Sequence, residues 1–197
     1  MRFLILFIIL TTNVFANDVS EIKNIVIHKD LKVYDNVIFL DKNDKKINIK
    51  EFNGNLLLLN FWATWCEPCK KQMRYLDLFY NHFKPSGFNV LTVNTDSPKS
   101  MSKVKPYVRT KGFEFNVAVD PNSQVKKRLK VQEMPTTIII DQDGSILYRH
   151  KGYVPGDEVG ILKAITDILD KKGIEYLPLD LDKVQAIKKK EKLNIDF

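Results

Sequence analysis

Hydrophobic and polar positions along the chain predict strands that alternate with helices. The short apolar run Leu56–Phe61 is typical of a strand buried on both faces. Residues 68–83 follow it with apolar side chains at near-helical spacing, and a helical first turn tolerates Pro68. The same reasoning predicts strands at 89–93, 117–119, 136–140 and 146–150, and helices at 99–111, from 124 to near 129, and at 157–169.

Two of these helices carry a more specific expectation. Pro106 should kink or shorten the helix at 99–111, because proline has no amide hydrogen to donate within a helix. The last helix should present a single apolar stripe, formed by Val159, Leu162, Ile165, Ile168 and Leu169.

The order of the elements predicts an α/β domain with a mixed central sheet and helices on both faces. Rough apolar alternation over residues 17–40, a polar turn at 41–45 and a returning strand at 47–49 predict an N-terminal β-hairpin. We place this domain at residues 17–172. We find no internal repeat and no low-complexity segment.

Residues 173–197 form a C-terminal tail of different character. Leu181, Val184 and Ile187 have the spacing of a narrow helical stripe beside the lysines at 188–190. Two interpretations stay open. In the first, the tail is a helix lying on the domain or a partly disordered end. In the second, it is a docking segment for a partner or an acidic membrane surface.

The first sixteen residues have the layout of an export signal. Arg2 precedes an apolar run at residues 3–10, and small residues at Val14 and Ala16 predict cleavage after Ala16. An uncleaved membrane anchor or a buried first strand are the alternatives. We therefore expect a periplasmic protein with no transmembrane span after cleavage, because no later stretch is long and apolar enough.

The net charge of +7 raises the question of nucleic-acid binding. The lysines and arginines are spread among 24 acidic residues, and no basic run is interleaved with aromatic side chains that would stack on bases. We therefore expect no nucleic-acid partner.

Candidate chemistry is concentrated in the two cysteines of the chain, Cys66 and Cys69. At this spacing both sulfurs fit the first turn of a helix, where free amides and the positive helix end stabilise a thiolate. A disulfide across so short a gap removes little chain entropy, which disfavours a purely structural role. Two cysteines supply half of a zinc shell, and His28, His82 and His150 lack ligand spacing, so we expect no metal and no cofactor.

Two motifs carry a family resemblance. The stretch Phe61–Lys70, with its Trp-Cys-Glu-Pro-Cys core, resembles the active site of the exported TlpA/ResA-type thiol–disulfide oxidoreductases of the thioredoxin superfamily. Met134-Pro135-Thr136 resembles their cis-proline loop. The resemblance covers about Val33–Lys172 and implies a thioredoxin fold, with residues 87–115 as the extra strand and helix of this branch. A peroxide-reducing relative would carry Thr three places before the cysteine, whereas Thr64 lies two places before Cys66.

The position of each cysteine suggests its role. Cys66 comes just before the helix and is the expected nucleophile, and Cys69, one turn inside, is the expected resolving thiol. By resemblance, the peptide bond before Pro135 is cis, and the backbone of Met134 pairs with an extended client segment. We expect Trp65, Glu67, Pro68 and Thr136 to complete the client-binding surface, with Trp62 in the core.

Two positions depart from the relatives in their proton-handling residues. Thioredoxin carries a buried Asp six residues before the first cysteine, where this chain has Asn60. ResA-type proteins carry a Glu three residues after the second cysteine, where this chain has Gln72. Because neither amide can take a proton, tuning of the thiol pKa values falls to water, Glu67 or Glu133 in this interpretation.

The same motif indicates the direction of the reaction. Glu67 disfavours a thiolate at Cys66, whereas Lys70, Lys71 and Arg74 favour it. Since nothing resembles the Pro-His insert of strong oxidants, we predict a reductant rather than a general folding oxidase. The resemblance implies a membrane electron donor of the CcdA or DsbD type. It also implies a client that is apocytochrome c or a copper-handling protein for cytochrome oxidase.

The competing hypothesis is a copper-binding assembly module that uses Cys66 and Cys69 as ligands. Such a site would add a His or Met, for which His150 and Met134 are the candidates. Copper-binding relatives usually have a longer gap between the cysteines, which counts against this interpretation.

Overall fold

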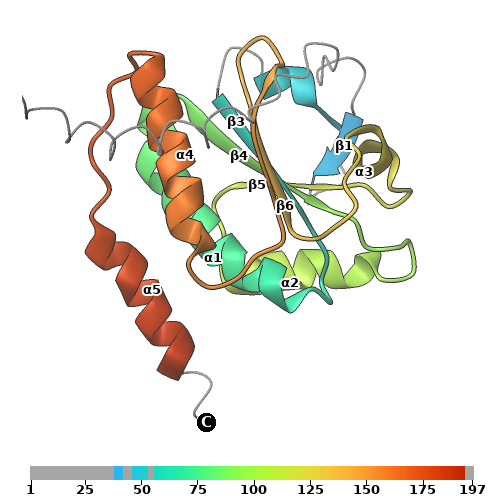
Figure 1. Ribbon diagram of the computed structural model, residues 1–197. Helices are drawn as coiled ribbons and strands as arrows, with labels where there is room; N and C mark the ends of the chain where they lie inside the picture. Colours follow the sequence, from blue (N-terminus) through green and yellow to red (C-terminus); the bar gives the residue numbers. More distant parts are fainter. Residues whose placement is uncertain (1–37, 42–45, 53–55, 194–197) are drawn as a thin grey trace, which may run out of the picture.

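The computed structural model describes residues 38–41, 46–52 and 56–193. It contains a seven-stranded mixed sheet in the order β2-β1-β5-β4-β3-β6-β7 (Figure 1). The strands are β1 (Ile38–Asp41), β2 (Lys46–Asn48), β3 (Leu56–Trp62), β4 (Phe88–Asn94), β5 (Asn116–Val119), β6 (Thr136–Ile140) and β7 (Ile146–Lys151). The helices are α1 (Glu67–Phe83), α2 (Val104–Lys111), α3 (Gln124–Arg128), α4 (Asp157–Lys171) and α5 (Leu181–Leu193). The predicted thioredoxin-like α/β architecture and its N-terminal hairpin are thereby confirmed.

Strand direction explains where the helices lie. Strands β3, β4 and β5 are parallel neighbours, joined through α1 and then α2, so two successive right-handed crossovers place both helices on one face. The chain then returns through α3 to β6, on the other side of β3, and α3 lies on the opposite face. Residues 87–115, expected to add a strand and a helix, form β4 and α2, and β4 pairs with β3 along its whole length.

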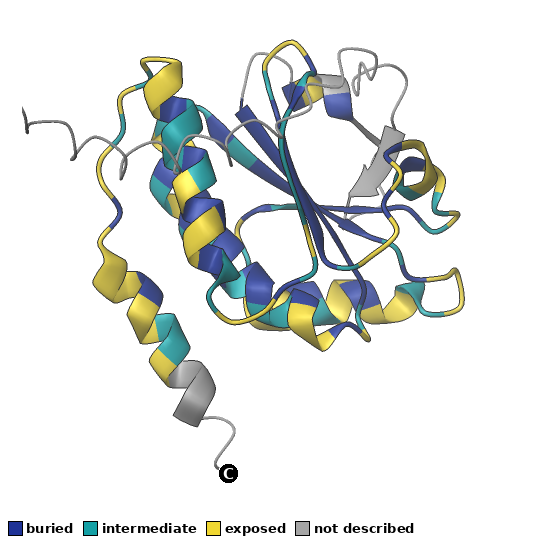
Figure 2. Cartoon of the chain, viewed as in Figure 1, coloured by how far each residue is buried: buried dark blue, intermediate teal, exposed yellow. Residues whose placement is uncertain are grey.

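The sheet separates two apolar cores. Alternate side chains of β3, such as Leu58 and Trp62, face α1, α2 and α4, and the others, such as Leu59, face α3 and the 3₁₀ turn Ile49–Phe52. This strand is buried at every position, as its apolar run predicted. Figure 2 shows the same division: the central strands β3 and β6 are buried throughout, and α1 and α4 are buried mainly toward the sheet. The active-site segment therefore leaves a rigid central strand.

Of the two expectations for the helices, the one for Pro106 is confirmed in one of its forms, and the one for the last helix is wrong at one residue. The segment 99–111 begins with a 3₁₀ turn at Met101–Lys103, and α2 starts only at Val104. Pro106 thus lies in the first turn of α2, where amides have no partner within the helix, so it shortens the helix instead of kinking it. In α4, the predicted stripe is wrong at Val159, which is 51% exposed. Ile161 is buried in the core instead, because the face of α4 that packs on the domain contains Ile161 and not Val159.

The C-terminal segment lies against the domain. Its start is held at the end of α1, where His82 Nε2 lies 2.7 Å from the carbonyl oxygen of Leu177. Ser86 Oγ donates to the carbonyl oxygen of Glu175 at 2.8 Å. Farther along, α5 packs on α1, and Val184 is buried in the larger core. Of the two interpretations of the tail, the one that places a helix on the domain therefore describes α5.

The described residues contain no helix that is long and apolar enough to span a membrane. The predicted export signal at residues 1–16 lies outside the described residues, as do the elements expected at 17–37.

Candidate active site

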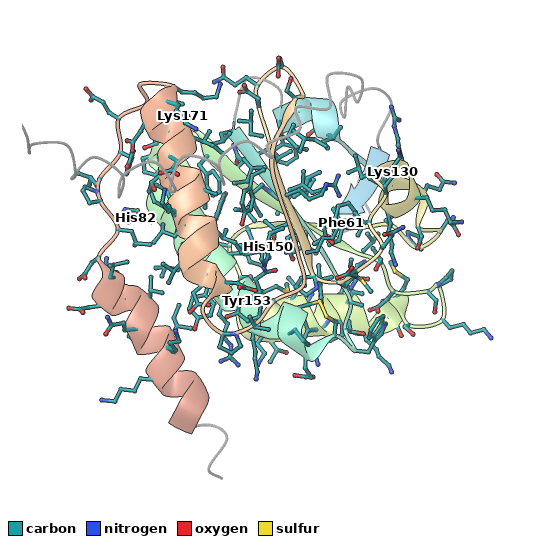
Figure 3. All side chains as sticks on the ribbon, viewed as in Figure 1. Phe61, His82, Lys130, His150, Tyr153 and Lys171 are labelled. Atoms are coloured by element: carbon teal, nitrogen blue, oxygen red, sulfur yellow. A yellow bond between two sulfur atoms is a disulfide. The ribbon has the colours of Figure 1, made fainter. Side chains whose placement is uncertain are left out.

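Cys66 and Cys69 form a disulfide at the start of α1, with Cα atoms 5.3 Å apart (Figure 3). Cys66 is the N-cap of the helix, in an extended backbone conformation, and its Sγ accepts a hydrogen bond from the Cys69 amide at 3.3 Å. Cys66 is 5% exposed, whereas Cys69 is fully buried. In the reduced protein, the sulfur at this N-cap faces the free amides of the first turn, which stabilise a thiolate.

The loop before Cys66 is fixed by a bond within itself and by bonds to the two residues that follow β4. The Thr95 amide donates to the carbonyl oxygen of Trp62 at 2.9 Å, and the Cys66 amide donates to that of Ala63 at 3.1 Å. Both carboxylate oxygens of Asp96 lie 3.2 Å from the Thr64 amide. These contacts set the direction in which the chain leaves β3 and enters α1.

Asp96 is a site residue that the sequence analysis missed. It is 1% exposed, and it accepts a second hydrogen bond from Asn94 Nδ2 at 3.3 Å. Its signal in the sequence is its place, two residues after the end of a buried central strand of a parallel pair. Polar residues at that edge meet the end of the adjacent strand, which here leads to Cys66.

The predicted cis-proline loop lies beside this segment. The peptide bond between Met134 and Pro135 is cis, as the motif implied. Met134 Sδ accepts a hydrogen bond from Thr95 Oγ1 at 3.1 Å, which ties the loop to the end of β4. On its other side, the Gly152 amide donates to the carbonyl oxygen of Pro135 at 2.7 Å. Thr136 is buried and donates through Oγ1 to the carbonyl oxygen of Glu133, so its hydroxyl closes the loop rather than facing solvent.

Asn60 and Gln72, which replace the acids of relatives, form one buried polar cluster with Thr137. Asn60 Nδ2 donates to Gln72 Oε1 at 2.6 Å and to Thr137 Oγ1 at 3.1 Å. Gln72 Nε2 lies 3.2 Å from the same hydroxyl, and all three side chains are fully buried. Asn60 Oδ1 is buried and has no hydrogen-bond partner among the described residues. The cluster carries no charge and has no carboxylate to exchange a proton.

The exposed rim of the site is formed by α1 and α2. Trp65 is 68% exposed beside Cys66, whereas Trp62 is fully buried against Tyr107, as expected. Lys70 Nζ lies 2.6 Å from Glu67 Oε1, and this hydrogen bond holds the pKa of the Glu67 carboxyl below its ordinary value. The same ammonium lies 5.7 Å from the centre of the Tyr107 ring, and burial raises the pKa of Tyr107 to about 12. The negative charge at Glu67 is thus paired locally.

Other candidate residues have partners away from the sulfurs. His150 Nε2 lies 3.0 Å from Asp157 Oδ2, and the Met134 sulfur contacts Thr95, so both proposed copper ligands are engaged elsewhere. The part of the chain that the structure describes contains no group of three or more His, Cys, Asp or Glu side chains arranged to hold a metal ion. Glu133 and Pro68 are exposed.

Comparison with known proteins assigns the chain to one family. The AhpC/TSA family model matches residues 28–149. The thiol-disulfide oxidoreductase ResA of Bacillus subtilis is 36% identical over 112 residues, which cover 57% of this chain and 62% of that protein. ResA of Bacillus anthracis is 33% identical over 132 residues, covering 66% of this chain and 75% of that protein. The chain therefore spans about two thirds of the length of the curated relatives that it matches.

Solved structures agree with the fold. A Chlorobium tepidum protein assigned as the thiol:disulfide interchange protein DsbE superposes with a TM-score of 0.64 at 28% identity, covering 68% of this chain and 92% of that one. StoA from Bacillus subtilis superposes with a TM-score of 0.56 at 21% identity, covering 66% and 95%, which supports the fold alone. The resemblance inferred from the two motifs is confirmed. The chain belongs to the AhpC/TSA family, and within it to the ResA-like thiol–disulfide oxidoreductases of thioredoxin fold.

Proposed function

We propose that this protein reduces disulfide bonds in client proteins, with Cys66 as the nucleophile and Cys69 as the resolving thiol. The observation that carries the proposal is the N-cap position of Cys66, whose sulfur accepts the Cys69 amide beside the cis-proline loop. Helix N-termini favour the thiolate over the thiol, and the slightly exposed sulfur is the one that a client can reach.

The reaction balances as two exchanges. The Cys66 thiolate attacks one sulfur of the client disulfide, forming a mixed disulfide and releasing the other client sulfur as a thiolate. Cys69, deprotonated in turn, attacks Cys66 Sγ, which breaks the mixed disulfide and releases the second client sulfur. The client gains two electrons and two protons, and the protein is left with the Cys66–Cys69 disulfide seen here. A donor of two electrons must then restore the dithiol.

The client-binding surface is assigned to the rim of the site. An extended client segment pairs with the backbone of Met134 by strand addition, and Trp65 and Pro68 contact its side chains. Glu67 borders the same surface, but its charge is offset by Lys70.

Proton transfer at Cys69 must differ from that in thioredoxin and ResA-type proteins, which use an acid near the resolving thiol. The neutral Asn60–Gln72–Thr137 cluster holds no proton acceptor, so we assign tuning of the thiol pKa values to Glu133 and Glu67, or to water. Glu133 lies next to the cis-proline loop, and its exposed side chain is free to approach a bound client. Replacing it by glutamine should shift at least one thiol pKa, and two unchanged values would contradict this role.

The sequence and the family resemblance also support a proposal for the biological setting. We propose an exported, periplasmic protein with a signal peptide at 1–16, a catalytic domain at 17–172 and a C-terminal tail at 173–197. Its clients would be apocytochrome c before haem attachment or a copper-handling protein for respiratory oxidase assembly. A CcdA- or DsbD-type membrane protein would return the electrons. Names of the relatives support thiol–disulfide exchange, while these finer assignments rest on the motif resemblance.

A trapping experiment tests the proposal. The Cys69→Ser variant should accumulate clients on Cys66 as mixed disulfides, because the resolving thiol is gone. The matched control, Cys66→Ser, should trap none, and dithiothreitol should release what the first variant holds. Identification of the trapped proteins names the pathway. Equal trapping by both variants, or none by Cys69→Ser, would contradict the assigned roles.

A further inference from the structure

A buried carboxylate lies in the first turn of α4. It belongs to Glu158, whose side chain is 0% exposed. Its Oε2 accepts hydrogen bonds from the Tyr153 hydroxyl at 3.0 Å and from the Gly156 amide at 2.7 Å. Lys188 Nζ, on α5, lies 3.2 Å from Oε1. Burial opposes the charged form, but these hydrogen bonds outweigh it and hold the pKa of Glu158 below its ordinary value.

The carboxylate fixes the loop 152–156, which joins β7 to α4. Tyr153 and Gly156, its two neutral donors, both belong to this loop, and Gly156 has φ +121°, a conformation that favours glycine. The loop is also bonded to the cis-proline loop, since the Gly152 amide donates to the Pro135 carbonyl oxygen at 2.7 Å. Figure 3 shows Tyr153 where this loop enters α4, on the same side of the sheet as α1.

A continuous set of contacts therefore leads from the C-terminal helix to the client-binding backbone. It passes from Lys188 to Glu158, then through Tyr153 and Gly156 to the loop, and from Gly152 to Pro135. The match to the family model covers residues 28–149, so Glu158 and Lys188 both lie outside the matched residues. This set of contacts, called the link below, joins the C-terminal part of the chain to the cis-proline loop.

The charge of Glu158 makes the link depend strongly on Lys188. A buried carboxylate that loses its cation is far less stable than a paired one, because neither water nor a counter-ion offsets its desolvation. Without Lys188, the carboxylate would be expected to turn toward solvent, giving up its bonds to Tyr153 and Gly156. The loop would then lose two of the bonds that hold its shape, whereas the disulfide and the start of α1 would keep theirs.

We propose that Lys188 is a positioning residue for client binding: by pairing with buried Glu158, it holds loop 152–156 and, through it, the cis-proline loop. This rests on the proposed function, since it assumes that a client pairs beside Pro135. Lys188 acts on how well the client is bound and leaves the sulfur chemistry unchanged.

Lys188→Met tests the link, with Lys189→Met as the matched control, because Lys189 is an exposed lysine on the same helix. Each variant reduces a peptide with one intramolecular disulfide, with dithiothreitol as electron source. Separately, the reduced protein, freed of dithiothreitol, reduces the small disulfide DTNB in a single turnover. Lys188→Met should raise KM for the peptide by about two- to tenfold, with kcat and the DTNB rate unchanged. Lys189→Met should match the wild type in both reactions.

A double variant separates charge from packing. Glu158→Gln combined with Lys188→Met removes the unpaired buried charge, so its KM should return toward the wild-type value. Hydrogen exchange of the Gly152 amide gives a readout that needs no activity, and it should become faster in Lys188→Met alone. An unchanged KM, or a double variant no better than Lys188→Met, overturns the proposal. A wild type that reduces no peptide overturns the proposed function instead, while Gly152 exchange still decides whether Lys188 holds the loop.

Discussion

The side-chain amide of Asn60 donates to Gln72 Oε1 at 2.6 Å, and this bond joins the two positions at which relatives carry acids. One residue lies on the central strand β3 and the other on α1, one turn after Cys69. With Thr137 they form a neutral, fully buried cluster. The folded domain therefore gains no pH dependence from these positions.

Asn60→Asp should create that pH dependence. The new carboxyl would be buried among neutral groups, so its pKa should rise above its unfolded value, near 3.9. Between these two pKa values the folded state binds more protons than the unfolded state. Stability relative to the wild type should therefore fall by about 1 to 3 kcal/mol as pH rises through this range, and stay constant above it.

Guanidinium denaturation of the wild type and Asn60→Asp at pH 4, 6 and 8 measures this effect. Gln72→Glu is the parallel variant and should behave in the same way. A stability difference that is the same at all three pH values would show that the new carboxyl is not held in a buried, neutral environment.

Asp96→Asn should lower the pKa of Cys66. The carboxylate is held against the Thr64 amide, two residues before the nucleophile, and a nearby negative charge disfavours a thiolate. Asparagine keeps one oxygen to accept the amide but removes the charge, so we expect a decrease of about 0.5 to 1 pKa unit. The pH dependence of iodoacetamide alkylation of Cys66 in the reduced protein measures it.

Asp77→Asn is the matched control for that variant. Asp77 also accepts a backbone amide, from Glu114 at 2.8 Å, but it lies eleven residues after Cys66 along α1, about 16 Å away. Its replacement should leave the alkylation profile unchanged. If both variants shift the profile equally, the effect is not specific to the charge beside Thr64.

Lys70→Met should raise the pKa of Cys66 by a few tenths of a unit. The substitution leaves the Glu67 charge without its partner at 2.6 Å, next to the nucleophile. The effect should shrink in high salt, because both groups are exposed enough to be screened. Lys71→Met removes the same charge without breaking this pair and should shift the alkylation profile less. An equal shift in both variants would argue against a role for the pair.

Acid should remove the contribution of Glu158 to stability. Burial raises the pKa of Glu158, but hydrogen bonds from the backbone amides of Glu158 and Gly156, and then from Lys188 and Tyr153, outweigh it and hold the pKa below the ordinary value of 4.5 in the folded protein. Its stabilisation is therefore full above about pH 4.5 and is lost as pH falls through the folded pKa. In denaturation series from pH 7 to pH 3, the difference in unfolding free energy between wild type and Glu158→Gln should narrow below about pH 4.5. A difference that grows toward low pH would contradict the charged state.

Local patterns were enough to predict the elements that carry the chemistry. Strand β6 was predicted with its exact bounds, because its β-branched residues at 136–140 are typical of a buried strand. The helix at 68–83 begins one residue earlier than predicted, at Glu67, since the Cys66 N-cap starts it. The cis bond before Pro135 came from the motif rather than from any local propensity.

Contacts between distant segments were not predictable in this way. Asp96 had no periodic signal, and its role depends on Thr64, 32 residues earlier, which only the pairing of β3 with β4 brings near. The error at Val159 arose because several apolar residues of α4 fit more than one stripe, and packing against the sheet decides which is buried. The Lys188–Glu158 pair likewise depends on where α5 packs.

The reduction potential of the Cys66–Cys69 pair tests the central claim most directly. Equilibration with glutathione or dithiothreitol at pH 7, followed by alkylation of free thiols, gives the fraction of oxidised protein. A client reductant should have a potential nearer to that of thioredoxin, about −270 mV, than to that of the strong oxidant DsbA, about −120 mV. A value close to −120 mV would contradict the account, because such a pair would oxidise its clients.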